Sequence, residues 1–336
     1  MAAEPLKTLF YPFEAEALPL PRKDDRALFI GAEPGFRLPT GFDAALHCVQ
    51  GFKPHFRALQ ASGYTVTPRV EGSDFDMALV LAGRHRGQNE MRIAEAIERV
   101  LPGGLVVVAG GKEDGIDSLR KRVNALAPLE SHLPKHHGIA FWLRATGGEA
   151  ASVLRAANPD LVVEGRFRTA PGMFSFDRID AGSKLLAVNL PNDLKGKIAD
   201  FCAGWGYLAG EVAARSPGLS DLDLYEADFE ALAAAKANLG ATAIEPRFFW
   251  TDLLTETVER RYDAIVMNPP FHSGRAAEPG IGAGMIRAAS KALKPGGRLF
   301  MVANRQLPYE QELSAAFASH VEIARDGMFK VFSARR

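Results

Sequence analysis

Residues 262–271 read Tyr-Asp-Ala-Ile-Val-Met-Asn-Pro-Pro-Phe. The uninterrupted apolar run 264–267 is typical of a central strand buried on both faces of a sheet. Because two consecutive prolines donate no amide hydrogen and hold φ at about −65°, the strand has to end at Asn268. Ligands of open α/β sheets bind beyond the carboxyl ends of the strands, so the Asn268 amide, the proline carbonyls and the Phe271 ring are placed to form a binding rim. Hydrogen-bond acceptors beside an aromatic ring suit a planar group that carries an amine, although Asn-Pro is also common in purely structural turns.

The composition indicates two domains and no overall charge that would attract polyanions. The chain has 336 residues, of which 47% are hydrophobic, and this is enough for two domains with cores of their own. Lysine plus arginine and aspartate plus glutamate both total 40, so contact with nucleic acid has to rely on a local basic patch. The two cysteines, Cys48 and Cys202, are too few for a disulfide framework or a zinc site. With no apolar stretch typical of a signal peptide or a membrane span, the sequence predicts a cytoplasmic protein that binds neither membrane nor metal.

Strand and helix patterns alternate through the first half of the chain. The sequence up to about Arg26 is rich in proline and predicts an irregular arm. Beyond it, alternation and short apolar runs predict strands over 27–30, 64–67, 77–81 and 105–109, and helices over 43–51 and 89–100. Such alternation is typical of a doubly wound parallel sheet with right-handed crossovers.

The pattern of the first half recurs in the second. Residues 75–81, a helix and a strand that begins Leu-Pro-Gly-Gly at 101 are matched by residues 262–267, a helix and a strand that begins Lys-Pro-Gly-Gly at 294. The second copy holds extra residues where Asn-Pro-Pro-Phe lies, and the first copy has Ala-Gly-Arg at 82–84 there. We therefore predict a duplicated α/β fold with domains at 1–150 and 151–336.

The second half also contains a nucleotide-binding turn. A predicted strand runs into Cys202-Ala-Gly204-Trp-Gly206, and a helix follows. The two glycines let the backbone approach a ligand closely at the helix N-terminus. Glu226 follows the next strand, where a carboxylate binds both hydroxyls of a ribose, and Asp252 follows the strand after it, where a carboxylate accepts from an adenine amine. NAD and S-adenosylmethionine share these groups; the absence of a proton donor suited to a nicotinamide favours the second.

Four motifs resemble those of one family of ribosomal RNA methyltransferases. They are Thr-Ala-Pro-Gly-Met-Phe-Ser at 169–175, Asp200 with its glycine turn, Asn-Pro-Pro-Phe-His at 268–272 and Gly-Met-Phe-Lys-Val at 327–331. Residues 169–336 resemble the class I S-adenosylmethionine-dependent enzymes of the small methyltransferase superfamily. Nearly the whole chain resembles the bacterial guanine-N2 enzymes of the methyltransferase C family, which act on 16S rRNA of the small ribosomal subunit. The resemblance implies two tandem Rossmann-like class I methyltransferase domains, of which the first is degenerate and serves substrate binding or stability and the second is catalytic.

The resemblance also implies the residues of the site. Catalysis is assigned to Asn268, Pro269, Pro270 and Phe271. S-adenosylmethionine binding is assigned to Phe174, Ser183, Asp200, Cys202, Gly204, Gly206, Glu226, Asp252 and Asn268. Binding of the guanine in 16S rRNA is assigned to Phe271, His272, Phe329 and Lys330. Cys202 departs from the family pattern, which usually has glycine there.

The implied reaction needs alignment more than basicity. The Asn268 oxygen and the Pro269 carbonyl accept the two N–H groups of the guanine amine and so aim its lone pair at the methyl group. Phe271 would stack on a base taken out of its helix. The resemblance implies a monomeric enzyme that acts without a metal ion.

Several alternatives remain open from the sequence. Asn-Pro-Pro followed by an aromatic residue also serves enzymes that methylate a 23S rRNA guanine, adenine N6 or a glutamine amide, because each presents an amine conjugated to a π system. An NAD-dependent oxidoreductase and a non-catalytic rRNA-binding assembly factor are readings from other classes. A ligand that binds only the folded protein raises its melting temperature, which separates S-adenosylmethionine from NAD.

Overall fold

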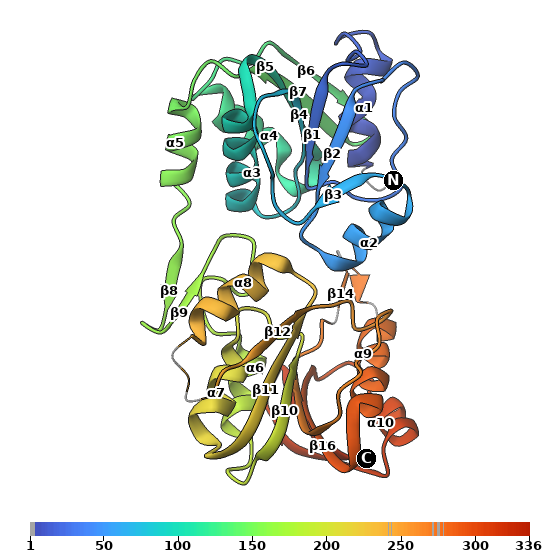
Figure 1. The fold of residues 1–336 in the computed structure, drawn as a ribbon, viewed down its shortest axis with the longest axis vertical. Coiled ribbons are helices and arrows are strands. Elements are labelled where there is room, and N and C mark those ends of the chain that lie inside the picture. The colour runs from blue at the N-terminus through green and yellow to red at the C-terminus, as the bar shows by residue number, and fades with distance from the viewer. Residues whose placement is uncertain (1–3, 241, 243, 271, 274–275, 278) are drawn as a thin grey trace. The chain divides into compact units, whose positions relative to one another are not determined.

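The computed structural model describes residues 4–336 with the exception of 241, 243, 271, 274–275 and 278. The chain folds into two compact units (Figure 1). The first comprises Met1–Asp160 and Ala170–Gly172, and the second comprises Leu161–Thr169 and Met173–Arg336. The division falls after helix α5 (Glu149–Ala156), so a boundary at residue 151 would cut a helix of the first unit.

The first unit contains one seven-stranded sheet. Its strands are β1 (Arg26–Ile30), β2 (Ala45–Val49), β3 (Thr65–Thr67), β4 (Phe75–Leu81), β5 (Val100–Gly111), β6 (Ser131–Lys135) and β7 (Gly138–Arg144). Its helices are α1 (Pro5–Glu14), α2 (Lys53–Ala61), α3 (Arg86–Arg99), the short η1 (Lys112–Asp114), α4 (Ile116–Asn124) and α5. The strand order is β3-β2-β1-β4-β5-β7-β6, in which every neighbouring pair is parallel except β5–β7 and β7–β6, so that β7 alone runs in the opposite direction.

The second unit repeats this sheet. Its main strands are β10 (Lys195–Phe201), β11 (Gly218–Glu226), β12 (Arg247–Trp250), β13 (Tyr262–Met267), β16 (Leu293–Asn304), β17 (Ser319–Arg325) and β18 (Phe329–Arg335). Two small antiparallel pairs are β8 (Leu161–Val163) with β9 (Phe167–Thr169) and β14 (His272–Ser273) with β15 (Ala276–Ala277). The helices are α6 (Ala181–Val188), α7 (Tyr207–Arg215), α8 (Phe229–Asn238), α9 (Pro279–Ala292) and α10 (Glu310–Ala316).

The two sheets have the same topology. The order β12-β11-β10-β13-β16-β18-β17 reproduces the first sheet strand for strand, and its last two strands are again antiparallel. The predicted duplication of a Rossmann-like α/β fold is therefore confirmed.

The aspartate and the Pro-Gly-Gly turn of the repeated pattern have the same structural roles in both units. Asp76 Oδ2 accepts from the backbone N–H of Arg26 (2.7 Å), and Asp263 Oδ2 accepts from the backbone N–H of Lys197 (2.8 Å). In each unit the aspartate thereby ties the central strand to the start of the strand beside it. The register with the following strand then shifts at the Pro-Gly-Gly turn in both sheets.

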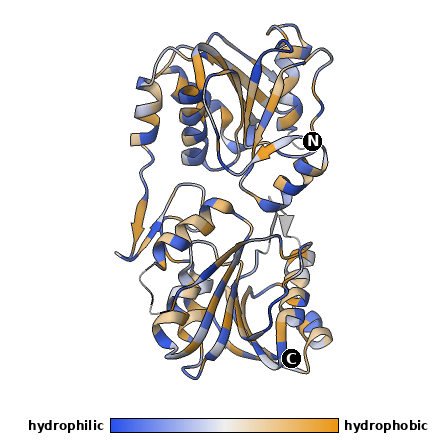
Figure 2. Ribbon diagram, in the orientation of Figure 1, coloured by the Kyte–Doolittle hydropathy of each residue, from blue (hydrophilic) through white to orange (hydrophobic). Residues whose placement is uncertain are grey.

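Apolar side chains cover both faces of each sheet. In β1, Leu28 and Ile30 pack into a cluster with α3 and α4, whereas Ala27 and Phe29 pack into a cluster with α1. In the second sheet the corresponding α9 face is filled by residues such as Ile265 and Met267. Figure 2 shows hydrophobic residues concentrated on the central strands. Burial on both faces explains why the central strands read as continuous apolar runs.

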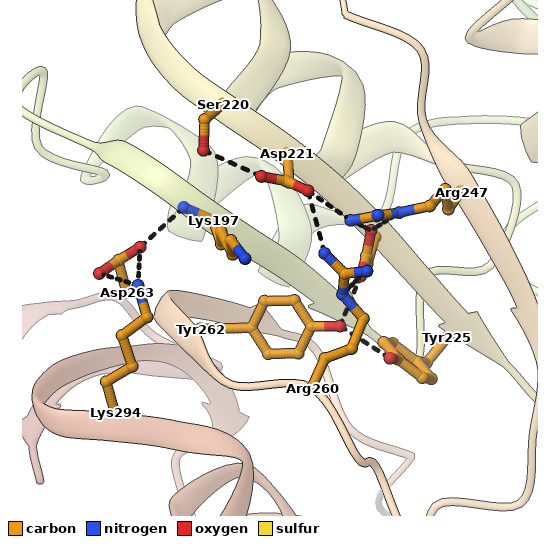
Figure 3. Close-up of polar contacts among 10 residues, drawn as sticks. Lys197, Ser220, Asp221, Tyr225, Arg247, Arg260, Tyr262, Asp263 and Lys294 are labelled. Carbon is orange, nitrogen blue, oxygen red and sulfur yellow. Dashed lines mark hydrogen bonds and ion pairs between the residues drawn. The ribbon is translucent and has the colours of Figure 1, made fainter.

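A buried ion cluster joins β11, β12 and β13 (Figure 3). Asp223 is fully buried; its Oδ1 accepts from Arg247 Nε (2.8 Å) and its Oδ2 accepts from the Tyr262 hydroxyl (2.6 Å). Arg260 pairs with the same carboxylate (3.0 Å), and the hydroxyls of Tyr225 and Tyr262 lie 2.7 Å apart. Burial raises the pKa of Tyr262, so this hydroxyl keeps its proton and donates it to Asp223. The cluster links these three neighbouring strands below their carboxyl ends, near the starts of β12 and β13.

Two predictions for the first unit are wrong. Residues 5–14 form helix α1 and not an irregular arm: Pro5 fits the first helical turn, and Leu9, Phe10 and Phe13 are buried on one face. Residues 45–49 form β2 and not a helix, because they pair in parallel with β1. Among the described residues, no helix combines the length and apolarity needed to traverse a bilayer.

Candidate functional site

The glycine turn after β10 has the backbone conformation that its sequence predicts. Gly204 and Gly206 have φ of 54° and 91°, in the left-handed region, and α7 begins at Tyr207. A Cβ on Gly206 would lie 3.1 Å from the Ala235 side chain, so both conformation and space favour glycine there. Cys202 is also left-handed, with φ of 60°, which accounts for glycine being usual at this position. The turn presents the N-terminus of α7 at the carboxyl edge of the sheet.

Asp200, near the end of β10, links this strand to helix α7, which follows the glycine turn. It is fully buried, and its Oδ2 accepts from the backbone N–H of Ala209 in α7 (2.9 Å). Its Oδ1 is buried without a hydrogen-bond partner, and burial raises the pKa of the carboxyl group. A buried polar atom without a partner indicates that a ligand group or a water completes the site.

Glu226 joins the turn to the end of β11. Its Oε2 accepts from Gly204 N–H (2.7 Å), and its Oε1 accepts from the N–H groups of Ala227 and Asp228 (both 2.8 Å). Burial raises the pKa of Glu226 from 4.5 to about 7, and these three hydrogen bonds offset part of that rise. A carboxylate oriented by backbone donors at the glycine turn fits the hydroxyls of a ribose.

Asp252 lies beyond the end of β12 and is buried. Its Oδ1 accepts from Leu254 N–H (3.0 Å), and its Oδ2 accepts from the Thr255 hydroxyl (2.5 Å). Each carboxylate oxygen keeps a further lone pair with which it can accept from an adenine amine. The adenine contact itself stays a prediction.

Asn268 is oriented by two residues at the start of α6. Its Nδ2 donates to Asp180 Oδ2 (3.0 Å) and to Ser183 Oγ (2.8 Å). Asp180 also caps α6 by accepting from Ser183 N–H (2.8 Å). An ionised carboxylate only accepts hydrogen bonds, so the amide nitrogen has to face Asp180 and the amide oxygen Oδ1 faces elsewhere. The arrangement leaves Asn268 as an acceptor for an amine.

Asn268 and the glycine turn line one small cavity. Its walls also include Asp180, Ser183 and Phe174. The Phe174 side chain is 57% exposed, and its carbonyl accepts from Trp205 Nε1 (2.9 Å). The structure thus brings together the predicted residues Phe174, Ser183, Cys202, Gly204 and Asn268.

Other predicted site residues lie elsewhere or are not described. Phe271 is outside the described residues, and His272 begins β14. Phe329 is buried, and its ring would be 3.0 Å from a Cβ on Gly182 in α6. Lys330 is buried, and its Nζ donates to Glu310 Oε1 (2.6 Å). The substrate contacts assigned to these four residues stay predictions.

Sequence reasoning missed the contact between Asp180 and Asn268. The residues are 88 positions apart, and Asp180 is not among the predicted site residues. The single available signal was the presence of an Asp-Ala-Gly-Ser segment within the same half of the chain as Asn-Pro-Pro.

The first unit has different side chains at the equivalent strand positions. Strand order and register equate β1 with β10, β2 with β11 and β4 with β13. The equivalents of Asp200, Glu226 and Asn268 are Phe29, Gln50 and Leu81, in that order.

Those replacements close the place where a ligand would bind. Phe29 lies in an aromatic cluster, with its ring centroid 5.3 Å from that of Phe36. Gln50 Nε2 donates to the carbonyl of Ala32 (2.6 Å). Residues 31–44, all described, contain no helix between β1 and β2, whereas α7 lies between β10 and β11.

Comparison with known proteins gives consistent results. The family model described as "Methyltransferase small domain" matches residues 164–333. The chain is 30% identical over 307 residues to the ribosomal RNA small subunit methyltransferase C of Pectobacterium atrosepticum, covering 88% of this chain and 87% of that one. It is 30% identical over 261 residues to the protein of the same name from Salmonella newport, covering 77% and 75%.

A solved structure shares the two-unit fold. It is a T. thermophilus 16S rRNA N2 methyltransferase in complex with AdoMet and guanosine. The match has a TM-score of 0.75 at 23% identity and covers 93% of this chain and 88% of that one.

Proposed function

The chain belongs to the ribosomal RNA small subunit methyltransferase C family, and from this premise we propose that it transfers a methyl group from S-adenosylmethionine to the N2 amine of a guanine in 16S rRNA. The observation that carries the proposal is the orientation of Asn268 beside the glycine turn, with its amide nitrogen on Asp180 and Ser183 and its amide oxygen in no hydrogen bond with the residues that the structure describes. An acceptor fixed at this position suits a neutral amine that has to present its lone pair.

The residues of the turn fit S-adenosylmethionine. The unpaired Asp200 oxygen, the left-handed glycines and Glu226 leave hydrogen-bonding capacity for the polar parts of a nucleoside cofactor. When bound, S-adenosylmethionine supplies an electrophilic methyl group on a sulfonium. The chain's own part is to hold the ribose through Glu226 and to leave the carboxyl edge of β13 open to the base.

The guanine amine would be held by two acceptors of the chain. Asn268 Oδ1 and the Pro269 carbonyl accept its two N–H groups, which directs the lone pair toward the methyl group and weakens its conjugation with the ring. Asp180 and Ser183 keep the amide from rotating, so the acceptor is in place before the base arrives. Fixing this geometry in advance lowers the entropic part of the barrier, and the amine loses its proton as or after it is alkylated.

The proposal includes a cytoplasmic monomer that acts without a metal ion. Ribosomal RNA and S-adenosylmethionine meet in the cytoplasm, and the alignment described above needs no Lewis acid. We expect turnover to persist in excess EDTA, which tests for a metal ion. We expect the sedimentation coefficient of a single chain, which tests for a monomer.

Methylation of purified 16S rRNA and of small subunits tests the proposal. Nucleosides from a reaction with S-adenosylmethionine should contain N2-methylguanosine, and rRNA from cells that lack the protein should have lost it at one position. N6-methyladenosine, a methylated protein or no product with either substrate would contradict the proposal.

A further inference from the structure

A second site lies on the outer side of α9. A hollow of about 480 Å³ opens between residues 253–258 of the β12–β13 connection, α9 and the end of β18. Four cationic side chains line it: Arg261, Arg287, Lys291 and Arg336. All four residues are exposed. In a protein whose formal net charge is zero, this is a local concentration of positive charge.

Few carboxylates neutralise these cations. Arg287 pairs with Glu312 (2.6 Å), whereas Arg261, Lys291 and Arg336 have no ion pair with any residue that the structure describes. Glu256 is the single acidic residue among the lining side chains of the described hollow, and its Oε2 accepts from the backbone N–H of Asp252 (2.8 Å). The hollow therefore carries an excess of positive charge.

Backbone carbonyls hold two of the arginines in place. Arg261 Nη1 donates to carbonyls of its own connection, including that of Val258 (3.0 Å). Arg336 Nη1 donates to the carbonyls of Lys291 and Leu293. A guanidinium has five N–H donors, so in each case donors remain for an anion while the side chain is already ordered. Oriented guanidinium groups match the oxygens of a phosphate.

One end of the hollow lies near the carboxyl edge of the sheet, where the proposed reaction takes place. Leu253, which lines it, directly follows Asp252, and Gly280 lines it at the start of α9, the helix that follows the Asn-Pro-Pro loop. The helix then runs from the carboxyl edge of the sheet toward Leu293, at the start of β16. With 14 residues it is about 21 Å long at about 1.5 Å per residue. Lys291 and Arg336 therefore lie at the end of the hollow away from the reaction edge.

We propose that this hollow binds phosphates of the RNA strand that flanks the target guanine. The inference rests on the proposed function and adds to it the path of the substrate along α9. Phosphate contacts fix the register of a nucleic acid without reading its bases. The hollow would therefore contribute to the affinity for RNA, whereas the cavity at Asn268 would determine which atom of the RNA is methylated.

A charge reversal at Lys291 tests the site with a matched control. Lys291 and Lys236 are both exposed lysines in the last turn of a helix of the second unit, and neither has an ion pair with the described residues. The probe is a fluorescent 16S rRNA fragment that the wild-type protein binds and methylates. Lys291→Glu should weaken binding about tenfold and Lys236→Glu should leave it unchanged.

Salt dependence separates phosphate contact from a change of fold. Lys291→Gln should lower the slope of log Kd against log salt by about 1, because one released counterion is lost. S-adenosylmethionine affinity and kcat at saturating RNA should stay at the wild-type values. RNA affinity unchanged in Lys291→Glu combined with Arg287→Glu would overturn the inference, as would equal losses in Lys291→Glu and Lys236→Glu. A wild-type protein that binds neither the RNA fragment nor small ribosomal subunits would instead refute the proposed function.

Discussion

Among single residues, we expect Asn268 to contribute more to the proposed chemistry than to cofactor binding. Asn268→Ala removes one acceptor for the amine but leaves Glu226 and the glycine turn intact. A lost neutral hydrogen bond is worth about 0.5–1.5 kcal/mol in binding. Because the lost acceptor also misaligns the lone pair, we expect kcat to fall at least about 100-fold, or about 2.7 kcal/mol of barrier, with S-adenosylmethionine affinity nearly unchanged. Single-turnover assays at saturating cofactor measure this, and near-normal turnover would rule the mechanism out.

Asp180 is predicted to act through Asn268 as a positioning residue. Asp180→Ser keeps a side chain that caps helices well, but a serine is too short to reach the Asn268 amide. We expect kcat to fall about tenfold while the KM for RNA and the melting temperature change little. Asp180→Asn keeps both length and cap, so it should recover part of the loss. A fall in melting temperature equal to the loss of activity, without recovery in Asp180→Asn, would indicate a role in folding alone.

Glu226 should make cofactor binding depend on pH near neutrality. Its pKa in the free folded protein is about 7, raised from 4.5 by burial, so the proton is lost only around pH 7. The ionised form accepts strong hydrogen bonds from both ribose hydroxyls, whereas the protonated form is a weaker acceptor and turns one of its oxygens into a donor. Affinity should be full above pH 7 and decline below it, approaching about tenfold per pH unit. Calorimetry between pH 5.5 and 8.5 measures the profile, and Glu226→Gln should give a weaker, flat one.

The same raised pKa has the opposite consequence for stability. A carboxyl group whose pKa is higher in the folded state holds its proton more tightly there than in the unfolded chain. Its contribution to stability is therefore present at low pH and is lost as pH rises from 4.5 to about 7.

The positions of candidate site residues could be predicted from the sequence where they lie at the carboxyl ends of strands, and their roles stay predictions. Asp200, Glu226 and Asn268 each end or follow a strand of the second sheet, and parallel strands bring such positions to one edge. The contact of Asn268 with Asp180 depends on how α6 packs, which no local pattern encodes. The contact of the buried Lys330 with Glu310 could not be predicted either, because it depends on how α10 packs against β18.

Among the secondary-structure elements, β11, β12 and β13 depend on the buried carboxylate of Asp223. Asp223→Ala removes the central carboxylate, although Arg247 and Arg260 keep their ion pairs with Asp221 and the Tyr262 hydroxyl keeps the Tyr225 hydroxyl as a partner. Because these partners remain and both arginines are partly exposed, we expect a loss of about 1–3 kcal/mol, less than the cost of breaking a fully buried ion pair. Denaturant unfolding should show a loss in this range for the second unit. The control is Glu322→Ala, which removes an exposed partner of Arg325 and should cost less than about 1 kcal/mol.

Prediction of the elements succeeded where an apolar run is continuous and failed where the local pattern is ambiguous. Residues 77–81, 105–109, 264–267 and 299–303, within β4, β5, β13 and β16, are buried and apolar throughout. The segment of β2 has only five residues, and so short a run does not distinguish a strand from a helix. Helix α1 contains Pro12 and starts at Pro5, which concealed its buried face.

For the whole molecule, the duplication explains how one fold can contain a single site. Both units have the same strand order and the same aspartate contact between strands, so the scaffold was retained in the first unit. The side chains at the carboxyl edge were not retained, since Phe29, Gln50 and Leu81 occupy the positions of Asp200, Glu226 and Asn268. The predicted degenerate role of the first domain, in substrate binding or stability, remains a proposal.

The chain should therefore bind one S-adenosylmethionine. In the first unit Gln50 donates to the Ala32 carbonyl and Phe29 fills the space beneath, so the single change Gln50→Glu should not create a second site. Gly206→Val forces a β-branched residue to a φ of 91° and against Ala235, and it should abolish the one site. Calorimetry of the full chain should give a stoichiometry of one for the wild type and Gln50→Glu, and no binding for Gly206→Val. Two sites in the wild type, or binding that survives in Gly206→Val, would place the cofactor in the first unit and contradict the assignment.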